Sequence, residues 1–239
     1  MKAIVLAAGK GTRLIKTGED FPKAMKPMKG KPLLSYVLNA LSFIEKKDIN
    51  IVVGYKKEKI IENFADYTFV VQEQQLGTGH AVKVCESKFS DYDGPVLVAF
   101  GDMPMIKSET YQKMLEGLVE NKADCMMLTV ITERKLPYGR IIRAENGEFI
   151  KITEQKDCNE KELLINELNP SVYAFNSKGL FSVLGKLKNN NSQSEYYLTD
   201  VPSLMKESGM KVITHTIRDD VQVLGVNDEN DLKLCEQYL

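Results

Sequence analysis

The stretch 1-MKAIVLAAGKGTRL-14 indicates the fold class, because an apolar strand runs directly into a loop of small residues. Lys2–Ala7 is apolar after its first residue, which is typical of a strand covered on both faces. In the loop, Gly9 and Gly11 would let the backbone approach a ligand closely, and polar neighbours supply hydrogen-bond donors, namely Lys10, Thr12 and Arg13. A loop of this kind after a first strand predicts a nucleotide-binding turn in a parallel sheet.

This loop matches neither of the two common phosphate-binding motifs. A dinucleotide fingerprint needs a third glycine at position 14, where Leu14 stands. A P-loop needs Gly-Lys-Ser/Thr after a four-residue gap, and that order is absent here. The loop alone therefore leaves a plain tight turn between strand and helix open as an alternative.

Strand-like and helix-like patterns alternate through the first half of the sequence. Beyond the first strand, we predict strands over 50–55, 67–71 and 95–100 and helices over 32–46, 57–64 and 78–87. The first of these helices has an apolar stripe that includes Leu33, Val37 and Leu41. Such alternation predicts right-handed βαβ units and a parallel sheet.

After residue 122 the pattern changes to shorter strands. We predict strands over 124–132, 164–175, 212–217 and 222–226, a hairpin over 140–154, a helix capped by the Thr199 hydroxyl and closed by Gly209, and a final helix over 228–238. The predicted fold class is α/β: a doubly wound, mostly parallel mixed sheet with a smaller inserted mixed-sheet lobe. We expect one domain over 1–239, with a nucleotide-binding half over about 1–122, the lobe over about 123–225 and a C-terminal return over about 226–239.

Composition and charge argue against several classes of protein. The 239 residues carry 32 Lys+Arg against 33 Asp+Glu, a net charge of -1, which disfavours a nucleic-acid carrier or a polybasic membrane binder. The longest apolar runs fall short of the ~20 residues that span a bilayer. The N-terminal apolar run breaks into Gly-Lys-Gly-Thr-Arg, so we interpret it as a buried strand and not as a signal peptide.

The cysteines indicate a reducing compartment. Cys85, Cys125, Cys158 and Cys235 form no CxxC motif and no Cys/His cluster, so neither a zinc site nor a disulfide framework is predicted. Unpaired thiols are typical of cytosolic proteins. We therefore expect a cytoplasmic protein.

Two further segments carry charges suited to a phosphorylated ligand. The segment 21-FPKAMKPMKGKPLL-34 gathers lysines close in sequence to Arg13, and a polyphosphate is the natural partner of such a cluster. Asp102 follows an apolar strand directly, at the edge where parallel sheets bind ligands, and a carboxylate there is suited to Mg²⁺ held jointly with substrate phosphates. The alternatives are a solvated lysine-rich loop and an Asp that caps a turn.

Eight motifs occur together in one order along the chain: LAAGKGTR, Pro22-Lys23, 74-QQLGTGHA-81, 101-GDMP-104, 138-YGRIIR-143, 152-ITEQKD-157, 195-EYYLTD-200 and 225-GVND-228. Together they closely resemble the sugar-1-phosphate nucleotidyltransferases, and most of all the pyrophosphorylase domains that make UDP-N-acetylglucosamine from UTP. The resemblance runs from residue 1 to about 230 and implies a Rossmann-like nucleotidyltransferase fold. It implies an enzyme that transfers UMP from UTP to a sugar 1-phosphate, with N-acetylglucosamine 1-phosphate as the expected acceptor, and releases pyrophosphate.

The resemblance also implies roles for individual residues. The nucleotide would be bound by Ala7, Ala8, Gly9, Gly11, Thr12, Gln72, Gln75, Gly77 and Thr78. The two glutamines would read the base edge, since an amide both donates and accepts hydrogen bonds. Catalytic Arg13 and Lys23 would neutralise the phosphates, and Asp102 and Asn227 would hold Mg²⁺. The sugar would be bound by Gly139, Glu154, Asn169, Tyr197 and Thr199.

Three features depart from the family pattern. The segment 14-LIKTGEDF-21 is longer than usual, and Ser171 and Ser194 stand where the family usually has glycine. A side chain where backbone would approach the sugar could shrink or re-polarise that pocket, so the sugar is predicted less firmly than the reaction. No hexapeptide repeat of a β-helix occurs, so no acetyltransferase activity is expected.

The expected partners are UTP, or another nucleoside triphosphate, and a sugar 1-phosphate, with no nucleic acid and no membrane. The oligomeric state is left open between a monomer and a small homo-oligomer. Two alternative functions remain: a cytidylyl- or thymidylyltransferase acting on another phosphorylated sugar or alcohol, and a non-catalytic module that senses sugar nucleotides.

Overall fold

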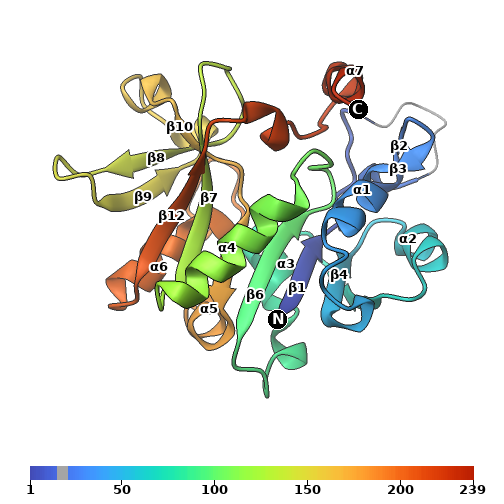
Figure 1. The fold of residues 1–239 in the computed structure, drawn as a ribbon, viewed down its shortest axis with the longest axis horizontal. Coiled ribbons are helices and arrows are strands. Elements are labelled where there is room, and N and C mark those ends of the chain that lie inside the picture. The colour runs from blue at the N-terminus through green and yellow to red at the C-terminus, as the bar shows by residue number, and fades with distance from the viewer. Residues whose placement is uncertain (15–20) are drawn as a thin grey trace.

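A computed structural model describes residues 1–14 and 21–239, and its N-terminal part is a parallel sheet (Figure 1). The strands are β1 (Lys2–Leu6), β4 (Ile49–Val53), β5 (Thr68–Val71) and β6 (Pro95–Phe100). They lie side by side in the order β5-β4-β1-β6, and each neighbouring pair is parallel. Because all four run the same way, the loops that follow them meet at one edge of the sheet.

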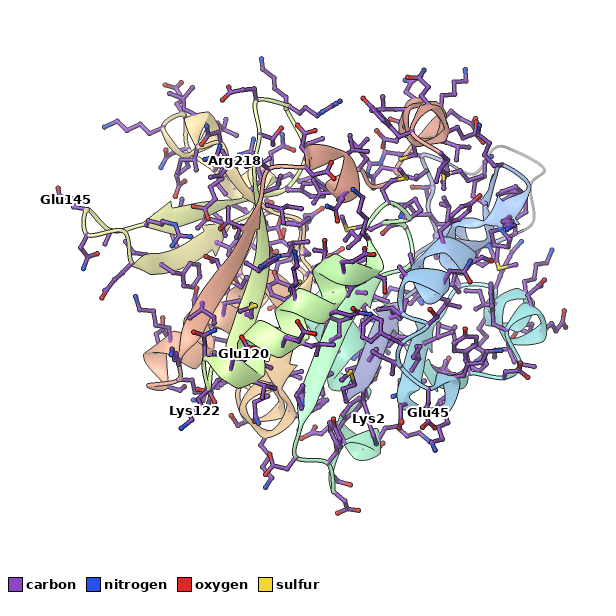
Figure 2. The ribbon with its side chains drawn as sticks, in the orientation of Figure 1. Lys2, Glu45, Glu120, Lys122, Glu145 and Arg218 are labelled. Carbon is purple, nitrogen blue, oxygen red and sulfur yellow. The ribbon has the colours of Figure 1, made fainter. Side chains whose placement is uncertain are left out.

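The second half of the chain extends the same sheet with mostly antiparallel strands. These are β7 (Cys125–Ile131), β8 (Gly139–Arg143), β9 (Phe149–Thr153), β10 (Glu167–Asn169), β11 (Tyr173–Asn176) and β12 (Val212–Ile217). The order continues from β6 as β11-β7-β10-β8-β9, and β12 pairs with β7 in parallel. The β8–β9 hairpin projects from the body, with Glu145 near its tip (Figure 2).

Helices cover both faces of the sheet, which confirms the doubly wound α/β fold class. One face carries α1 (Leu33–Ala40), α2 (Lys57–Asn63) and α4 (Ser108–Glu120), and the other carries α3 (Thr78–Lys83), α5 (Ser177–Leu184) and α6 (Val201–Glu207). Strand β1 shows why both faces are buried. Its Ala3 and Val5 join the core under α1 and α4, and its Ile4 and Leu6 join the core under α3 and α5.

The C-terminal return forms a third, smaller core. A short hairpin, β2 (Pro27–Met28) with β3 (Lys31–Pro32), packs near α7 (Glu229–Gln237). Asp228 caps α7 through a capping box with Asp231. This packing holds the residues just before α7 beside the loops of the parallel sheet.

Several predicted elements differ from the structure. The predicted strand over 222–226 is wrong: a 3-10 turn spans Asp220–Val223, and Val223, Leu224 and Val226 are apolar because they fill cores, not because they pair. The predicted Thr199 cap is also wrong, since α6 begins after Asp200 and shows no side-chain cap.

The remaining differences are two elements of other lengths than expected and two unpredicted helices. The helix expected over 32–46 ends at Ala40, and the strand expected over 164–175 is divided into β10 and β11. Helices α4 and α5 have no counterpart among the predicted elements.

The described part of the chain contains no helix that is both long and apolar enough to cross a bilayer.

Candidate active site

A pocket of about 370 Å³ opens at the edge where β1, β5 and β6 end. It brings together all the residues predicted for the nucleotide, for catalysis and for the metal: Ala7, Ala8, Gly9, Gly11, Thr12, Arg13, Lys23, Gln72, Gln75, Gly77, Thr78, Asp102 and Asn227. These residues meet at one edge because the strands are parallel, and most of them follow the C-terminal end of a strand.

The glycine loop after β1 makes room for Lys23. Gly11 has a φ of +68°, and a Cβ built there would lie 2.5 Å from the Lys23 Cβ. Any other residue at position 11 would be strained and would push against the lysine stem. Gly11 therefore allows the cationic side chain to pass under the loop into the pocket, while Arg13 lies exposed at the rim.

Lys23, Asp102 and Asn227 form one polar cluster at the pocket floor. The Lys23 ammonium is paired with the Asp102 carboxylate and donates to Asn227 Oδ1 at 2.9 Å. The backbone fixes the two acceptors next to each other, because the Val226 N–H donates to the Asp102 carbonyl at 2.9 Å. Two oxygens and one cation are thus held at a single point.

The donor set at this point fits a hard divalent cation. Asp102 offers a carboxylate and Asn227 an amide oxygen, and both already face one positive charge. Within residues 1–14 and 21–239 no group of three or more His, Cys, Asp or Glu side chains gathers into a protein-only cage. A cation held here would complete its shell with water and ligand oxygens, which is the usual situation of Mg²⁺.

The amide side chains lie at the other end of the row of parallel strands, because Gln72 follows β5 and Asp102 follows β6, with β4 and β1 between them. Gln72 is only 3% exposed, whereas Gln75 is exposed and donates from Nε2 to the Gln72 backbone carbonyl at 3.3 Å. Gly77 has a φ of +113°, and a Cβ there would lie 2.6 Å from the Tyr196 carbonyl. The loop that carries these residues is therefore pressed against the 195–198 segment and needs glycine at position 77.

Thr78 joins the nucleotide loop to the segment predicted to bind the sugar. Its hydroxyl accepts a hydrogen bond from the Leu198 N–H at 3.0 Å, and the Gly79 N–H donates to the Tyr196 carbonyl at 2.8 Å. The sequence predicted a nucleotide role for Thr78, and the structure adds this structural role.

The residues predicted for the sugar are outside the lining of the pocket, on the lobe. Thr199 donates to Glu154 Oε1 at 2.8 Å. Burial raises the pKa of Glu154, and the nearby acids Asp200, Asp157 and Glu195 act in the same direction, while the Thr199 hydrogen bond opposes them. A ligand that donates hydrogen bonds to this carboxylate would stabilise its charged form.

Asn169 is fully buried and its amide is occupied. Its Nδ2 donates to the Leu128 carbonyl at 2.9 Å, and its Oδ1 accepts from the Ser171 N–H at 3.2 Å and from the Tyr173 hydroxyl at 2.6 Å. Gly139 lies opposite Asn169 in the β8–β10 pair. Tyr197 is buried too, and its hydroxyl accepts from Gln193 Nε2 at 2.9 Å.

Sequence reasoning missed two residues and assigned too much to the lysine cluster. Glu195 lines the pocket although only its motif was noted, and His80 contacts Gln72 from behind. Among the clustered lysines, Lys23 alone lines the pocket: Lys26 pairs with Glu229, and Lys29 binds Glu236 through its backbone N–H. The longer segment after Arg13 lies outside the described residues between 15 and 20.

The comparisons with known proteins identify the family. The model of the MobA-like NTP transferase domain matches residues 3–213. The chain is 42% identical over 238 residues to the "Bifunctional protein GlmU" of Streptococcus thermophilus, covering 99% of this chain and 51% of that protein. It is 38% identical over 239 residues to the protein of the same name from Clostridioides difficile, again covering 51% of it. The chain thus spans about half the length of the curated relatives it matches.

Solved structures share the fold at lower identity. A UDP-glucose pyrophosphorylase complexed with UDP-glucose superposes with a TM-score of 0.77 at 19% identity, over 99% of this chain and 97% of that one. A Bacillus anthracis protein assigned as a glucose-1-phosphate thymidylyltransferase gives a TM-score of 0.77 at 18% identity, over 99% and 94% of the two chains.

Proposed function

This chain belongs to the MobA-like NTP transferase domain family, and from that membership we propose that it is a sugar-1-phosphate nucleotidyltransferase. It takes UTP and N-acetylglucosamine 1-phosphate, forms UDP-N-acetylglucosamine and releases pyrophosphate. The observation that carries this proposal is the arrangement of one pocket, with amide side chains at one end and the Lys23, Asp102 and Asn227 cluster at the other.

The separation of the two ends suits a nucleoside triphosphate. The buried Gln72 and the exposed Gln75 offer amide groups to a base, and the small-residue loop Ala7–Gly11 lies between them and the charged end. Lys23 and Arg13 then meet the phosphates. We assign the second, hydroxyl-rich substrate to the lobe residues Glu154 and Thr199, which are hydrogen-bonded to each other.

In the proposed reaction, a phosphate oxygen of the sugar phosphate attacks the α-phosphorus of UTP in line, and the bond to the β-phosphate oxygen breaks. Two anionic reactants must be brought together, so positioning and neutralisation of charge dominate over proton transfer. Lys23 and Arg13 supply cationic donors for this purpose. Asp102 and Asn227 would hold Mg²⁺, which would further neutralise the phosphate charge when bound.

The partners and compartment follow from the same proposal. UTP and a sugar 1-phosphate are the proposed small-molecule partners, and the cytoplasm is the proposed compartment because nucleoside triphosphates and reduced thiols are both found there. Nucleic acid and membranes have no part in the proposed reaction, and the protein acts as a monomer or a small homo-oligomer.

Pyrophosphate release across a matrix of substrates tests the proposal. The purified protein is assayed with UTP, CTP, dTTP and ATP against N-acetylglucosamine 1-phosphate, glucose 1-phosphate and other sugar phosphates, with Mg²⁺ present. We expect the highest kcat/KM for UTP with N-acetylglucosamine 1-phosphate. A clear preference for CTP or dTTP would replace the uridyl assignment, and binding without turnover for every pair would indicate a sensing module.

A further inference from the structure

Gln72 has a fixed amide orientation in the pocket. Its Nε2 donates to the Gly77 carbonyl at 3.1 Å and contacts Nδ1 of His80 at 3.0 Å. A side-chain amide nitrogen carries two hydrogens: the Gly77 carbonyl takes one, and His80 Nδ1 accepts the other in the tautomer that is protonated at Nε2. The amide oxygen of Gln72 is therefore the polar atom that remains for a ligand in the pocket, which Gln72 lines.

His80 lies behind Gln72, outside the nucleotide pocket. It belongs to α3 and lines a separate cavity of about 230 Å³ together with Leu76, Lys83, Leu184, Leu187 and Tyr196. Burial lowers the pKa of His80, and Lys83 acts in the same direction, while a hydrogen bond to the Gln74 backbone opposes them. The imidazole is thus neutral at pH 7, and a neutral imidazole has one nitrogen that accepts a hydrogen bond.

Resting on the proposed function, we propose that His80 is a positioning residue that sets the base specificity of the enzyme. By accepting a hydrogen bond from Gln72 Nε2, it keeps the Gln72 carbonyl oxygen directed to the base. That oxygen accepts a hydrogen bond from the N3–H of uracil or thymine. Cytosine has an unprotonated N3, so the same geometry places an acceptor against an acceptor and rejects CTP.

The backbone supports this arrangement but cannot secure it alone. The Gly77 carbonyl is held in place because Gly77 is pressed against Tyr196, so it remains an acceptor in any His80 variant. Without the second acceptor, one amide hydrogen of the nearly buried Gln72 loses its partner, and the side chain can rotate to satisfy it elsewhere. Discrimination between the two pyrimidines should then fall before turnover is abolished.

The experiment compares kcat/KM for UTP and CTP in the wild type and in three variants. His80→Leu keeps the apolar packing and removes the acceptor, and His80→Asn places an oxygen acceptor at the position of Nδ1. His215→Leu is the matched control, since His215 is the other histidine of the chain and lies on β12. We expect His80→Leu to lower the UTP/CTP ratio about tenfold or more, which is the scale of one lost buried hydrogen bond. His80→Asn should restore most of the ratio, and His215→Leu should leave it unchanged.

The outcomes separate this inference from the proposed function. If the enzyme turns over UTP but the ratio of kcat/KM for UTP to that for CTP is the same in His80→Leu as in the wild type, the role of His80 is wrong. The proposed nucleotidyltransferase function is then unaffected. Absence of wild-type turnover with every nucleotide would overturn both. If His80→Leu does not fold, ¹⁵N NMR of wild-type His80 decides: an unprotonated Nδ1 bonded to the Gln72 amide supports the proposal, and a protonated Nδ1 contradicts it.

Discussion

The ammonium of Lys23 forms an ion pair with Asp102, 79 positions further along the chain, and the same ammonium donates to Asn227 Oδ1 at 2.9 Å. Three segments that are remote in sequence thus meet at one point of the pocket. Their side chains stay partly accessible, at 15% for Lys23 and 26% for Asp102. This cluster is where the proposed function predicts the strongest effects of mutation.

Replacing Lys23 or Arg13 with alanine should lower turnover by roughly 10²–10³-fold, because each removes a positioned charge donor. Neither side chain belongs to an apolar core, so the melting temperature should change by no more than about 4 °C. The measurement is steady-state pyrophosphate release together with thermal unfolding. Lys31→Ala, an exposed lysine of the β2–β3 hairpin, is the control. A loss below fivefold for both variants, with normal melting, would exclude the phosphate role.

A second prediction concerns competition between Lys23 and a divalent cation. Both need the Asp102 and Asn227 oxygens, so Lys23→Met should increase the affinity for Mn²⁺, by about fivefold or more given the Coulomb repulsion it removes. Asp102→Asn should weaken the same affinity. Electron paramagnetic resonance of free Mn²⁺, without any nucleotide, measures both effects independently of activity. Equal Mn²⁺ affinity in the wild type and both variants would show that the cation binds elsewhere.

The residues predicted for the nucleotide gather in one pocket for a reason that is visible in the sequence, whereas the positions of those predicted for the sugar are not. The loop after β1 and Asp102 follow strands of the parallel sheet, so strand direction alone brings them to one edge. The residues predicted for the sugar lie on antiparallel strands, directly after β9 and on the 195–200 segment, and their positions depend on long-range pairing. No local pattern shows that Thr199 donates to Glu154, 45 positions away, instead of capping α6.

Two errors in the predicted elements concern how apolar residues are interpreted. An apolar run over 222–226 was interpreted as a strand, but burial against other elements also produces apolar runs. Conversely, α4 was missed although Tyr111, Met114, Leu115 and Leu118 have helical spacing and are buried. The helical spacing of α4 is visible in the sequence, whereas the contact between His80 on α3 and Gln72 just after β5 depends on how the chain folds between them.

A third prediction follows from the raised pKa of Glu154. Because the folded-state pKa lies above the ordinary value of 4.5, the stability associated with this group is present below pH 4.5 and is lost as the pH rises through the folded-state pKa. Glu154→Gln removes this titration and keeps an oxygen that can accept from Thr199. The free energy of unfolding of the variant, relative to the wild type, should therefore increase between pH 4 and pH 7, as measured by urea titration.

The same variant should lose activity while it gains stability. A sugar hydroxyl deprived of a charged acceptor costs ~1–3 kcal/mol, so efficiency with the sugar phosphate should fall roughly 5- to 150-fold. The KM for UTP should hardly change, because Glu154 is outside the lining of the nucleotide pocket. If the difference in free energy of unfolding between the variant and the wild type does not change from pH 4 to pH 7, the raised pKa of Glu154 is contradicted. If kcat/KM falls equally for the sugar phosphate and for UTP, the role of Glu154 in sugar binding is contradicted.

The last prediction concerns Ser171, which has a φ of +62° and stands where the sequence resemblance leads us to expect glycine. Its N–H donates to Asn169 Oδ1 at 3.2 Å, and the same oxygen accepts from the Tyr173 hydroxyl at 2.6 Å. Ser171 thus helps to occupy the one amide expected to meet an N-acetyl group. Ser171→Gly keeps this N–H, removes the hydroxymethyl group beside Asn169 and relaxes the left-handed strain. Efficiency with N-acetylglucosamine 1-phosphate should then rise relative to glucose 1-phosphate.

Lys122→Gly separates this effect from a general effect of relieved strain. Lys122 also has a positive φ, of +48°, but it lies exposed just after α4, far from the lobe hairpin tip marked by Glu145 (Figure 2). Its replacement should relieve similar strain, on the order of 1 kcal/mol, without changing the ratio of the two efficiencies. If the ratio is the same in the wild type and in both variants, Ser171 does not shape the sugar pocket. If neither sugar phosphate is used by any of the three proteins, the acceptor is a different phosphorylated compound, and a cytidylyltransferase becomes the better assignment.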